Sequence, residues 1–151
     1  MIDVTSYRGA NIINMGNECY YGLRNVLRSK LLRKDTKCTI YKALIRQMVL
    51  YGCESWILKK TDNEKHSISE RKILKKIYGP TSFNGVWRIK YDDDLHSLYK
   101  EPSIVKIIKI ARLKWLGHTA RMEDNVPCMK ITFSQPEGSR KERSPILRWL
   151  E

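Results

Sequence analysis

The chain has 151 residues, which is enough for one ordinary domain or two very small ones. Apolar residues make up 42% of it, so a buried core can form and wholesale disorder is excluded. The 29 Lys and Arg against 16 Asp and Glu give a formal net charge of +13. Such an excess makes a polyanion such as nucleic acid the first candidate partner, with solubility alone as the alternative.

The sequence pattern argues against membrane insertion and secretion. No apolar run approaches the roughly 20 residues that span a bilayer, and residues 1–17 lack a basic start followed by an apolar stretch. The four cysteines are widely spaced and include no C-x-x-C pair, which fits neither a zinc site nor a disulfide scaffold. We therefore expect an intracellular protein, of the nucleus or cytoplasm, with free thiols and no membrane contact.

The N-terminal third is predicted to contain an irregular segment and two helices. Residues 1–16 show no clear period. Residues 17–33 carry apolar side chains at helical spacing on one face and cations on much of the remainder. The next helix is predicted to have Asp35 or Thr36 as its N-cap, to be apolar around a wide arc, and to stop at Gly52.

The middle of the chain predicts a long helix and a connecting segment. A capping box of Thr61 and Glu64 opens the helix, and Gly79 with Pro80 ends it. Residues 80–90 contain Gly, Pro, Asn and aromatic residues, which predicts a loop or a short strand. Along the helix the apolar positions share one face and the lysines lie roughly opposite; the apolar positions are Ile73, Leu74 and Ile77.

The C-terminal half predicts two more helices and one strand. Asp92 or Asp93 caps a short helix, and Ser103 caps a longer one that Gly117 ends or loosens. Residues 128–133 have the β-propensity of a single strand. The predicted fold class is mainly α, a small bundle of about five helices with at most one or two short strands and an irregular basic tail. The longer helix carries one apolar stripe, formed by Ile104, Ile107, Ile108, Ala111 and Trp115.

Two clusters of cations on the predicted helices are candidate phosphate contacts. Each cluster falls within about a third of its helix circumference. Few acids follow four residues later to balance them, which is unusual for a helix face that is merely solvated. The alternative remains an ordinary solvated face. The clusters are Lys72, Lys75 and Lys76 on the first helix, and Lys106, Lys109 and Arg112 on the second.

The tetrapeptide from Tyr91 to Asp94 fits the Y-x-D-D pattern of polymerases, in which paired carboxylates hold two divalent metals. That chemistry needs the two aspartates on a tight turn between apolar strands, with a third carboxylate nearby. Here the flanking residues predict a loop and a helix. We therefore expect these acids to cap a helix rather than to catalyse.

His118 and the four tryptophans have both structural and functional interpretations. No Cys or second His lies at metal-ligand spacing from His118, so a packed histidine is the first alternative, a phosphate or base contact the second and a metal ligand the third. Tryptophans can stack on bases, but they also anchor the cores of small helical domains. We expect at least two of the four tryptophans to be core residues. The four are Trp56, Trp87, Trp115 and Trp149.

Three blocks of sequence identify a family resemblance. Residues 112–122 read RLKWLGHTARM, residues 51–56 read YGCESW, and residues 70–80 read ERKILKKIYGP. In this order and spacing they resemble the RLxWxGHxxRM, YGxExW and ERKILRxIxGP blocks of non-LTR (LINE-type) retrotransposon reverse transcriptases. Residues 41–46, 87–91 and 95–99 continue the resemblance, although Gln47 stands where the family usually has Pro. The tail at residues 136–149 resembles the family's closing PxGxR…GRPxxRW block, but the Gly-Arg of GRP is lost.

The resemblance implies a division of the chain and a role for it. Residues 17–80 correspond to the thumb, a helical subdomain that grips the template–primer duplex, and residues 81–135 to a helical post-thumb linker. An irregular segment (1–16) precedes them and a basic tail (136–151) follows. The implied partner is RNA, DNA or an RNA–DNA hybrid. The block at residues 112–122 adds His118 and Arg121 to the six cations as candidate nucleic-acid contacts.

The same resemblance implies that these residues are not catalytic on their own. The family is an RNA-directed DNA polymerase whose palm, upstream of all these blocks, holds Mg²⁺; no segment here resembles that palm, so we expect no catalytic residue, metal or cofactor in this chain. The alternative is a helical interaction or scaffold remnant, or a decayed element without a selected role. In that case orphaned apolar surface is expected to cause self-association.

Overall fold

The computed structural model describes residues 14–56, 59–83, 85–123 and 125–133 and confirms the mainly α class. The basic tail and Trp149 lie outside these residues. Residues 14–22 are helical. The elements that follow are α2 (Arg24–Arg28), α3 (Lys34–Ile40), the π-helical turn η1 (Tyr41–Ile45), α4 (Arg46–Leu50), the 3-10 turn η2 (Cys53–Ser55), α5 (Lys60–Tyr78), β1 (Thr81–Phe83), β2 (Val86–Arg88), α6 (Asp92–Tyr99), α7 (Ile104–Thr119) and α8 (Pro127–Phe133).

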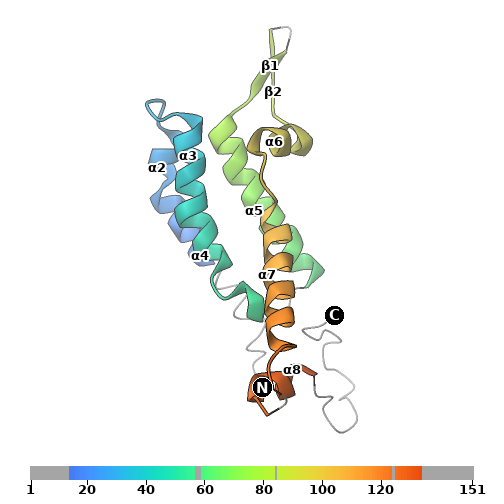
Figure 1. Cartoon of the computed structure of the whole chain (residues 1–151). Helices are drawn as coiled ribbons and strands as arrows, with labels where there is room; N and C mark the ends of the chain where they lie inside the picture. Colours follow the sequence, from blue (N-terminus) through green and yellow to red (C-terminus); the bar gives the residue numbers. More distant parts are fainter. Residues whose placement is uncertain (1–13, 57–58, 84, 124, 134–151) are drawn as a thin grey trace.

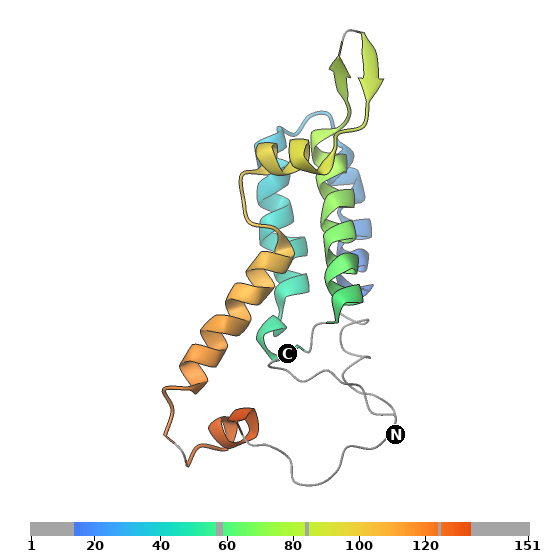
Figure 2. The ribbon, with the colours of Figure 1, turned by 90° about the vertical axis from the view of Figure 1, so that its right-hand side faces the viewer.

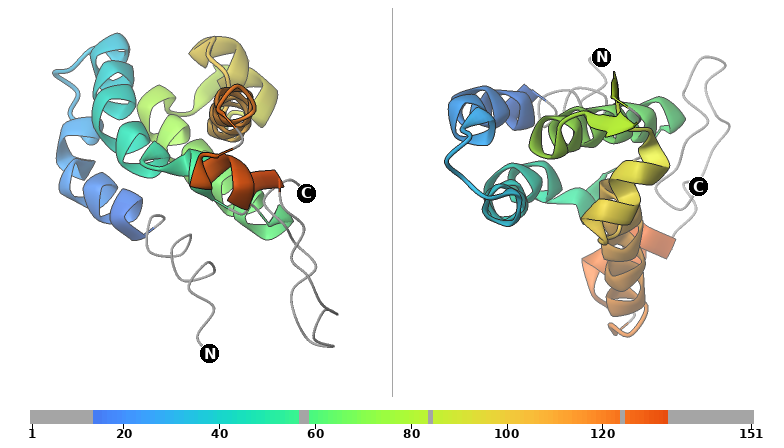
Figure 3. Two further views of the ribbon diagram at one scale, coloured as in Figure 1. Left: turned by 60° about the horizontal axis from the view of Figure 1, so that its bottom comes forward. Right: turned by 90° about the horizontal axis from the view of Figure 1, so that it is seen from above.

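Three rods of helix form the body. Residues 14–22 with α2 make the first, the continuous run of α3, η1 and α4 makes the second, and α5 lies beside both (Figure 1). Helix α6 crosses one end of these rods, and the two-stranded hairpin of β1 and β2 projects beyond that end (Figures 1 and 2). Helix α7 then leads away from the body toward the opposite end, as the view from above also shows (Figure 3).

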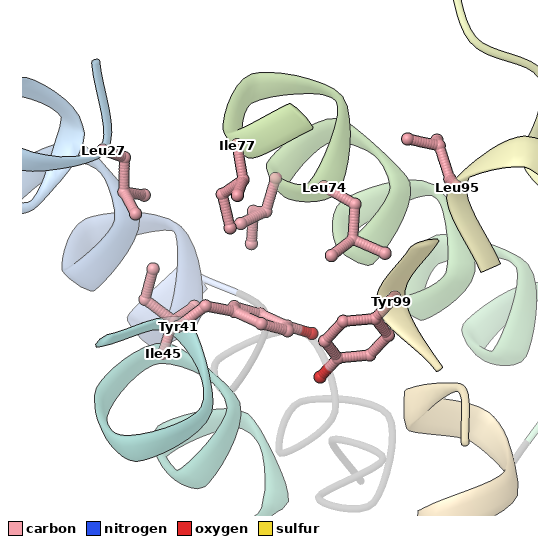
Figure 4. Packing of buried hydrophobic residues seen from close by; sticks show 8 residues of the cluster. Leu27, Tyr41, Ile45, Leu74, Ile77, Leu95 and Tyr99 are labelled. Carbon is pink, nitrogen blue, oxygen red and sulfur yellow. The ribbon is translucent and has the colours of Figure 1, made fainter. Parts of the chain in front are cut away.

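The main core lies where the rods meet α6. Leu27 of α2 and Tyr41 of η1 face the apolar row of α5, and Tyr99 of α6 closes the cluster (Figure 4). The rings of Tyr41 and Tyr99 are tilted by 57° with centroids 6.1 Å apart. The apolar face that was predicted for α5 is confirmed, because Ile73, Leu74 and Ile77 are all buried here. The whole cluster consists of Leu27, Tyr41, Ile45, Ile73, Leu74, Ile77, Leu95 and Tyr99.

A second cluster joins α7 to the turn after α4. Ile104 and Ile108 of α7 pack with Val49, Cys53 and Trp56. The Trp56 ring also stacks on the buried His66 of α5, at 5.6 Å between centroids and 11° between planes. Burial lowers the pKa of this histidine, which favours its neutral form. Trp56 is therefore a core residue, as predicted, and it ties α5 to the same cluster.

Two glycines act as the predicted stop signals. Gly52, at φ 65°, follows the rod of α3, η1 and α4, and Gly79, at φ 67°, ends α5. Both adopt the left-handed region that a residue without a Cβ reaches at low cost. The short helix α6 and the longer α7 are also confirmed, with Ser103 at the N-cap position of α7.

Several predicted helix boundaries are wrong. The first helical region ends at Arg28 instead of Arg33, because the chain turns at residues 29–33 and leaves Leu31 exposed. Helix α5 begins two residues earlier than the predicted capping box of Thr61 requires. Its N-cap is Lys59, whose backbone N–H donates to the Asp62 carboxylate at 3.4 Å.

Two further N-cap predictions are also wrong. Arg33 takes the N-cap position of α3, in place of Asp35 or Thr36. Tyr91 takes that of α6, and its backbone N–H donates to Asp94 at 3.2 Å. In both helices the predicted acid lies in the first turn instead, where it still interacts favourably with the helix dipole.

The predicted strand at residues 128–133 is wrong, because these residues form α8. Pro127 occupies the first helical position, for which its fixed φ is well suited. The Thr132 hydroxyl donates to the Cys128 carbonyl at 2.8 Å, one helical turn earlier. A short apolar run is compatible with either a strand or a helix, and its β-branched residues misled the prediction.

Gly117 does not end α7, which continues to Thr119. The Thr119 side chain is fully buried, and its hydroxyl donates to the Trp115 carbonyl at 2.9 Å. A glycine inside a helix costs only about 1 kcal/mol relative to alanine, so burial of the turn that follows it can keep that turn helical.

Candidate nucleic-acid interface

Helix α7 exposes a face of lysines and aliphatic side chains. Its opposite face is fixed by burial of Ile104, Ile108 and Thr119, so the remaining side must face solvent. Lys106 and Lys109 are exposed there, as predicted. Ile110 and Leu113, 46% and 67% exposed, share this side. We call the exposed side the α7 face; it consists of Lys106, Lys109, Ile110, Leu113 and Lys114.

A buried carboxylate fixes where α7 starts. Glu70 lies in the middle of α5 and is buried, and its Oε2 accepts the backbone N–H of Ile104 at 3.0 Å. Its Oε1 accepts the Tyr41 hydroxyl at 3.1 Å. Three elements of the fold, η1, α5 and α7, therefore meet at one side chain. A free N–H group at a helix N-terminus is a natural partner for a carboxylate.

The electrostatics of this junction follow from its burial. Loss of hydration raises the pKa of Glu70, and the two hydrogen bonds oppose that rise only in part. Burial, followed by the nearby Glu70 charge, also raises the pKa of Tyr41 far above its ordinary value, so its hydroxyl remains a donor. Glu70 was missed as a functional candidate, although its position in the apolar row with Ile73, Leu74 and Ile77 was a readable signal that it faces the core.

The lysines of α5 gather at its C-terminal end. Lys72 is exposed, and Lys75 and Lys76 are half-buried in the last two turns. Cations at this end of a helix are also favoured by the helix dipole, which gives them a purely structural explanation. They lie on the hairpin side of Glu70, whereas α7 leads in the other direction (Figure 1). The structure therefore separates the two predicted clusters instead of joining them into one patch.

The acids that form ion pairs contact cations outside the two lysine clusters. Within the described ranges the ion pairs do not involve the lysines of the α7 face or those at the end of α5. Those lysines are therefore available to an external anion. The pairs join Lys42 and Arg46 to Glu101, Lys65 to Asp62, Arg71 to Asp92, and Arg88 to Asp94.

The remaining predicted contacts lie at different positions on α7 and just after it. Arg112 is half-buried at the edge of the packed side, and burial lowers the pKa of its guanidinium. His118 is exposed with its ring 5.8 Å from that of Trp115. Arg121 is exposed near Gly117, where a Cβ would lie 3.6 Å from the Arg121 Nη1. Lys114 was missed; it follows Lys106 by eight residues, which places it about 80° away on the exposed side.

The Y-x-D-D tetrapeptide lies at the start of α6, with its three aspartates in the first helical turn. Asp92 pairs with Arg71, and Asp94 both pairs with Arg88 at 3.3 Å and caps α6. The pair that the pattern requires, Asp93 and Asp94, lies in the first turn of a helix instead of on a turn between two strands, and Asp94 is already engaged by Arg88, so this geometry does not fit the paired-metal chemistry of a polymerase palm. Across the described part of the chain there is also no group of three or more His, Cys, Asp or Glu that could hold a metal ion.

Comparisons with known proteins point to a transposon. The chain is 22% identical over 134 residues to an uncharacterised transposon-derived protein of Caenorhabditis elegans. The match covers 87% of this chain and 47% of that protein, so the chain spans about half the length of its relative. No protein-family profile and no solved structure matches the chain. Among the described helices, none is both long and apolar enough to cross a membrane.

Proposed function

We propose that the chain is the thumb and post-thumb part of a non-LTR retrotransposon reverse transcriptase and binds template–primer nucleic acid through its phosphates. It does so without catalysis of its own. The lineage is supported by the three sequence blocks and by the transposon-derived relative. The binding mode is supported by one observation above all, the α7 face, whose lysines are exposed and have no acid partner among the described residues.

The blocks that carry the resemblance coincide with structural junctions. Trp56 closes the block at residues 51–56 and stacks on His66, and Glu70 opens the next block and caps α7. Tyr41, which opens the stretch at residues 41–46, donates to Glu70. These residues hold the scaffold, which supports the view that the chain shares the family's thumb architecture. The cations on the outside then carry the contacts with nucleic acid.

The arrangement favours contact with the backbone over sequence recognition. Lysine ammonium groups act as point charges toward phosphates, and such contacts position a protein without specifying a base sequence. The α5 lysines span about 6 Å along that helix, from Lys72 to Lys76, and the α7 lysines span about 12 Å along theirs, from Lys106 to Lys114. At about 3.4 Å of rise per base pair, the α5 set can follow about two base pairs of a duplex and the α7 set about three to four.

Removal of lysine charge from the α7 face tests the proposal. The double variant Lys106→Gln with Lys109→Gln should bind a labelled RNA–DNA hybrid more weakly, by the same factor for unrelated sequences, and should reduce the salt dependence by about two phosphate contacts. Lys60→Gln, at the opposite end of α5 from its lysine cluster, is the matched control. An unchanged affinity in the double variant, with a normal melting temperature, would contradict the proposed face.

A second candidate function is protein interaction. The rod of η1 and α4 exposes Leu44, Met48 and Tyr51 at spacings of four and three residues, which form one apolar stripe. Exposed apolar stripes of this kind mark interaction surfaces or cause self-association. Light scattering separates this candidate from the first, because a concentration-dependent oligomer that binds no nucleic acid would favour it. A monomer with a cooperative melt would disfavour it.

A further inference from the structure

The β1–β2 hairpin carries large side chains that the fold leaves uncovered. All three residues of β2 are exposed, and Trp87 keeps 71% of its surface open. Ile89 and Tyr91 follow Trp87 at alternate positions and are both 70% exposed. A two-stranded hairpin is marginally stable in water, so exposed tryptophan does not add to its own stability. Contiguous exposed apolar surface of this kind marks a binding site.

Trp87 is the ring that remains open to a ligand. Its cross-strand partner is Ser82, which is too small to cover an indole. The Tyr91 ring, in contrast, is already covered by the Arg88 guanidinium, 5.2 Å from the ring centroid. Arg88 is held in turn by Asp94 at 3.3 Å. The base of the hairpin is therefore fixed, while the Trp87 ring faces solvent.

The charges around the hairpin indicate what kind of ligand the ring meets. Residues 79–91 contain Arg88 and Lys90 and no acid. The hairpin also follows directly on the lysine-bearing end of α5. Two of the three aspartates that begin α6 are paired, with Arg71 and with Arg88. Arg88 is balanced by Asp94, whereas Lys90 and the lysines at the end of α5 have no acid partner among the described ion pairs. An aromatic ring near these lysines suits a nucleobase and its phosphates better than an apolar protein surface.

The spacing connects this ring to the proposed duplex contacts. From Lys76 the chain completes α5 and reaches Ser82, opposite Trp87, which spans at most roughly 16 Å at about 1.5 Å per helical and 3.3 Å per extended residue. That is at most about five base-pair steps. The hairpin continues from the lysine-bearing end of α5 (Figure 1). A strand whose phosphates contact these lysines can therefore present an unpaired base within that distance to the hairpin.

We propose that Trp87 on the β1–β2 hairpin is a stacking site for an unpaired base at the end of a duplex held by the neighbouring lysines. This inference rests on the proposed function and adds to it the part of the nucleic acid that is recognised. Stacking tolerates any base, since every base has an aromatic face. One stacked base changes affinity by roughly 5- to 150-fold.

The test compares two RNA–DNA hybrids of equal duplex length, one blunt and one with a four-nucleotide single-stranded overhang. The full chain is expected to prefer the overhang, and Trp87→Ala is expected to remove at least fivefold of that preference without changing the affinity for the blunt hybrid. Extra phosphates in the overhang act equally on both proteins, so the difference isolates the ring. Val86→Ala, on the other side of the same strand, is the matched control and should behave like the wild type.

The outcomes separate this inference from the proposed function. If both hybrids bind and Trp87→Ala keeps the full overhang preference, the stacking site is overturned while phosphate binding stands. If neither hybrid binds, the proposed function fails and the stacking site with it. If Trp87→Ala only converts an oligomer into a monomer, the hairpin is a protein contact and the stacking site is overturned. Unchanged melting temperatures confirm that each variant is folded.

Discussion

Replacement of Glu70 by Ala should destabilise the protein more than any exposed substitution on α5. Glu70 accepts two buried hydrogen bonds, from the Tyr41 hydroxyl and from the Ile104 backbone N–H. Alanine would leave both donors unpaired, at about 1–3 kcal/mol each. Relief of the desolvated carboxylate offsets part of this loss. We therefore expect the free energy of unfolding to fall by about 2–4 kcal/mol.

Chemical denaturation followed by circular dichroism measures this difference through the shift in midpoint at constant slope. Glu64→Ala is the matched control, because Glu64 is exposed on the same helix and its replacement should change stability by less than about 0.5 kcal/mol. Tyr41→Phe should cost about 1 kcal/mol, and in combination with Glu70→Ala it should cost less than the sum of the two. If Glu70→Ala is as mild as Glu64→Ala, the junction does not hold α7 as described.

The remaining predictions concern pH and two glycines. Burial raises the pKa of Glu70 in the folded state above its ordinary value of 4.5, so protonation of Glu70 stabilises the fold fully only below that ordinary value, and this contribution is lost as pH rises through the folded-state pKa. Thermal melts at a series of pH values should therefore show the wild type losing stability relative to Glu70→Gln between these two pKa values. Gly16→Ala should destabilise by about 1–2 kcal/mol, since its Cβ would lie 2.5 Å from Val49 Cγ2 and this crowding exceeds the gain in helix propensity. Gly22→Ala has nothing within 4 Å of its Cβ and should raise stability by up to about 1 kcal/mol in the same denaturation assay; the opposite order of the two glycine variants would contradict the packing described.

Helix periodicity predicted the parts of the fold that depend on local sequence. The apolar rows of α5 and α7 recur at three and four residues, so burial of Ile73 and Ile108 could be read directly. The stop at Gly52 was equally readable, because glycine reaches positive φ at little cost. Helix starts were less predictable, since a backbone N–H can donate to any nearby carboxylate and several polar residues compete for each cap.

The parts that were missed depend on contacts between distant segments. No local pattern shows that Glu70 meets the first N–H of α7, because residues 34 positions apart come together only when α6 turns the chain back. The continuation of α7 past Gly117 depends in the same way on where Thr119 packs. For the candidate site, exposure of Lys106 and Lys109 followed from periodicity. The half-burial of Arg112 and the exposure of Lys114 could be predicted only once the packed side was known.

The salt dependence of binding to a labelled RNA–DNA hybrid tests the central claim most directly, with duplex DNA measured alongside. If three lysines on the α7 face and three on α5 neutralise phosphates, the logarithm of affinity should fall with the logarithm of salt at a slope of about −5 on duplex DNA, and of about −3 if only one set engages. Micromolar protein that binds neither nucleic acid at low salt, or binding with a slope near zero, would contradict the account.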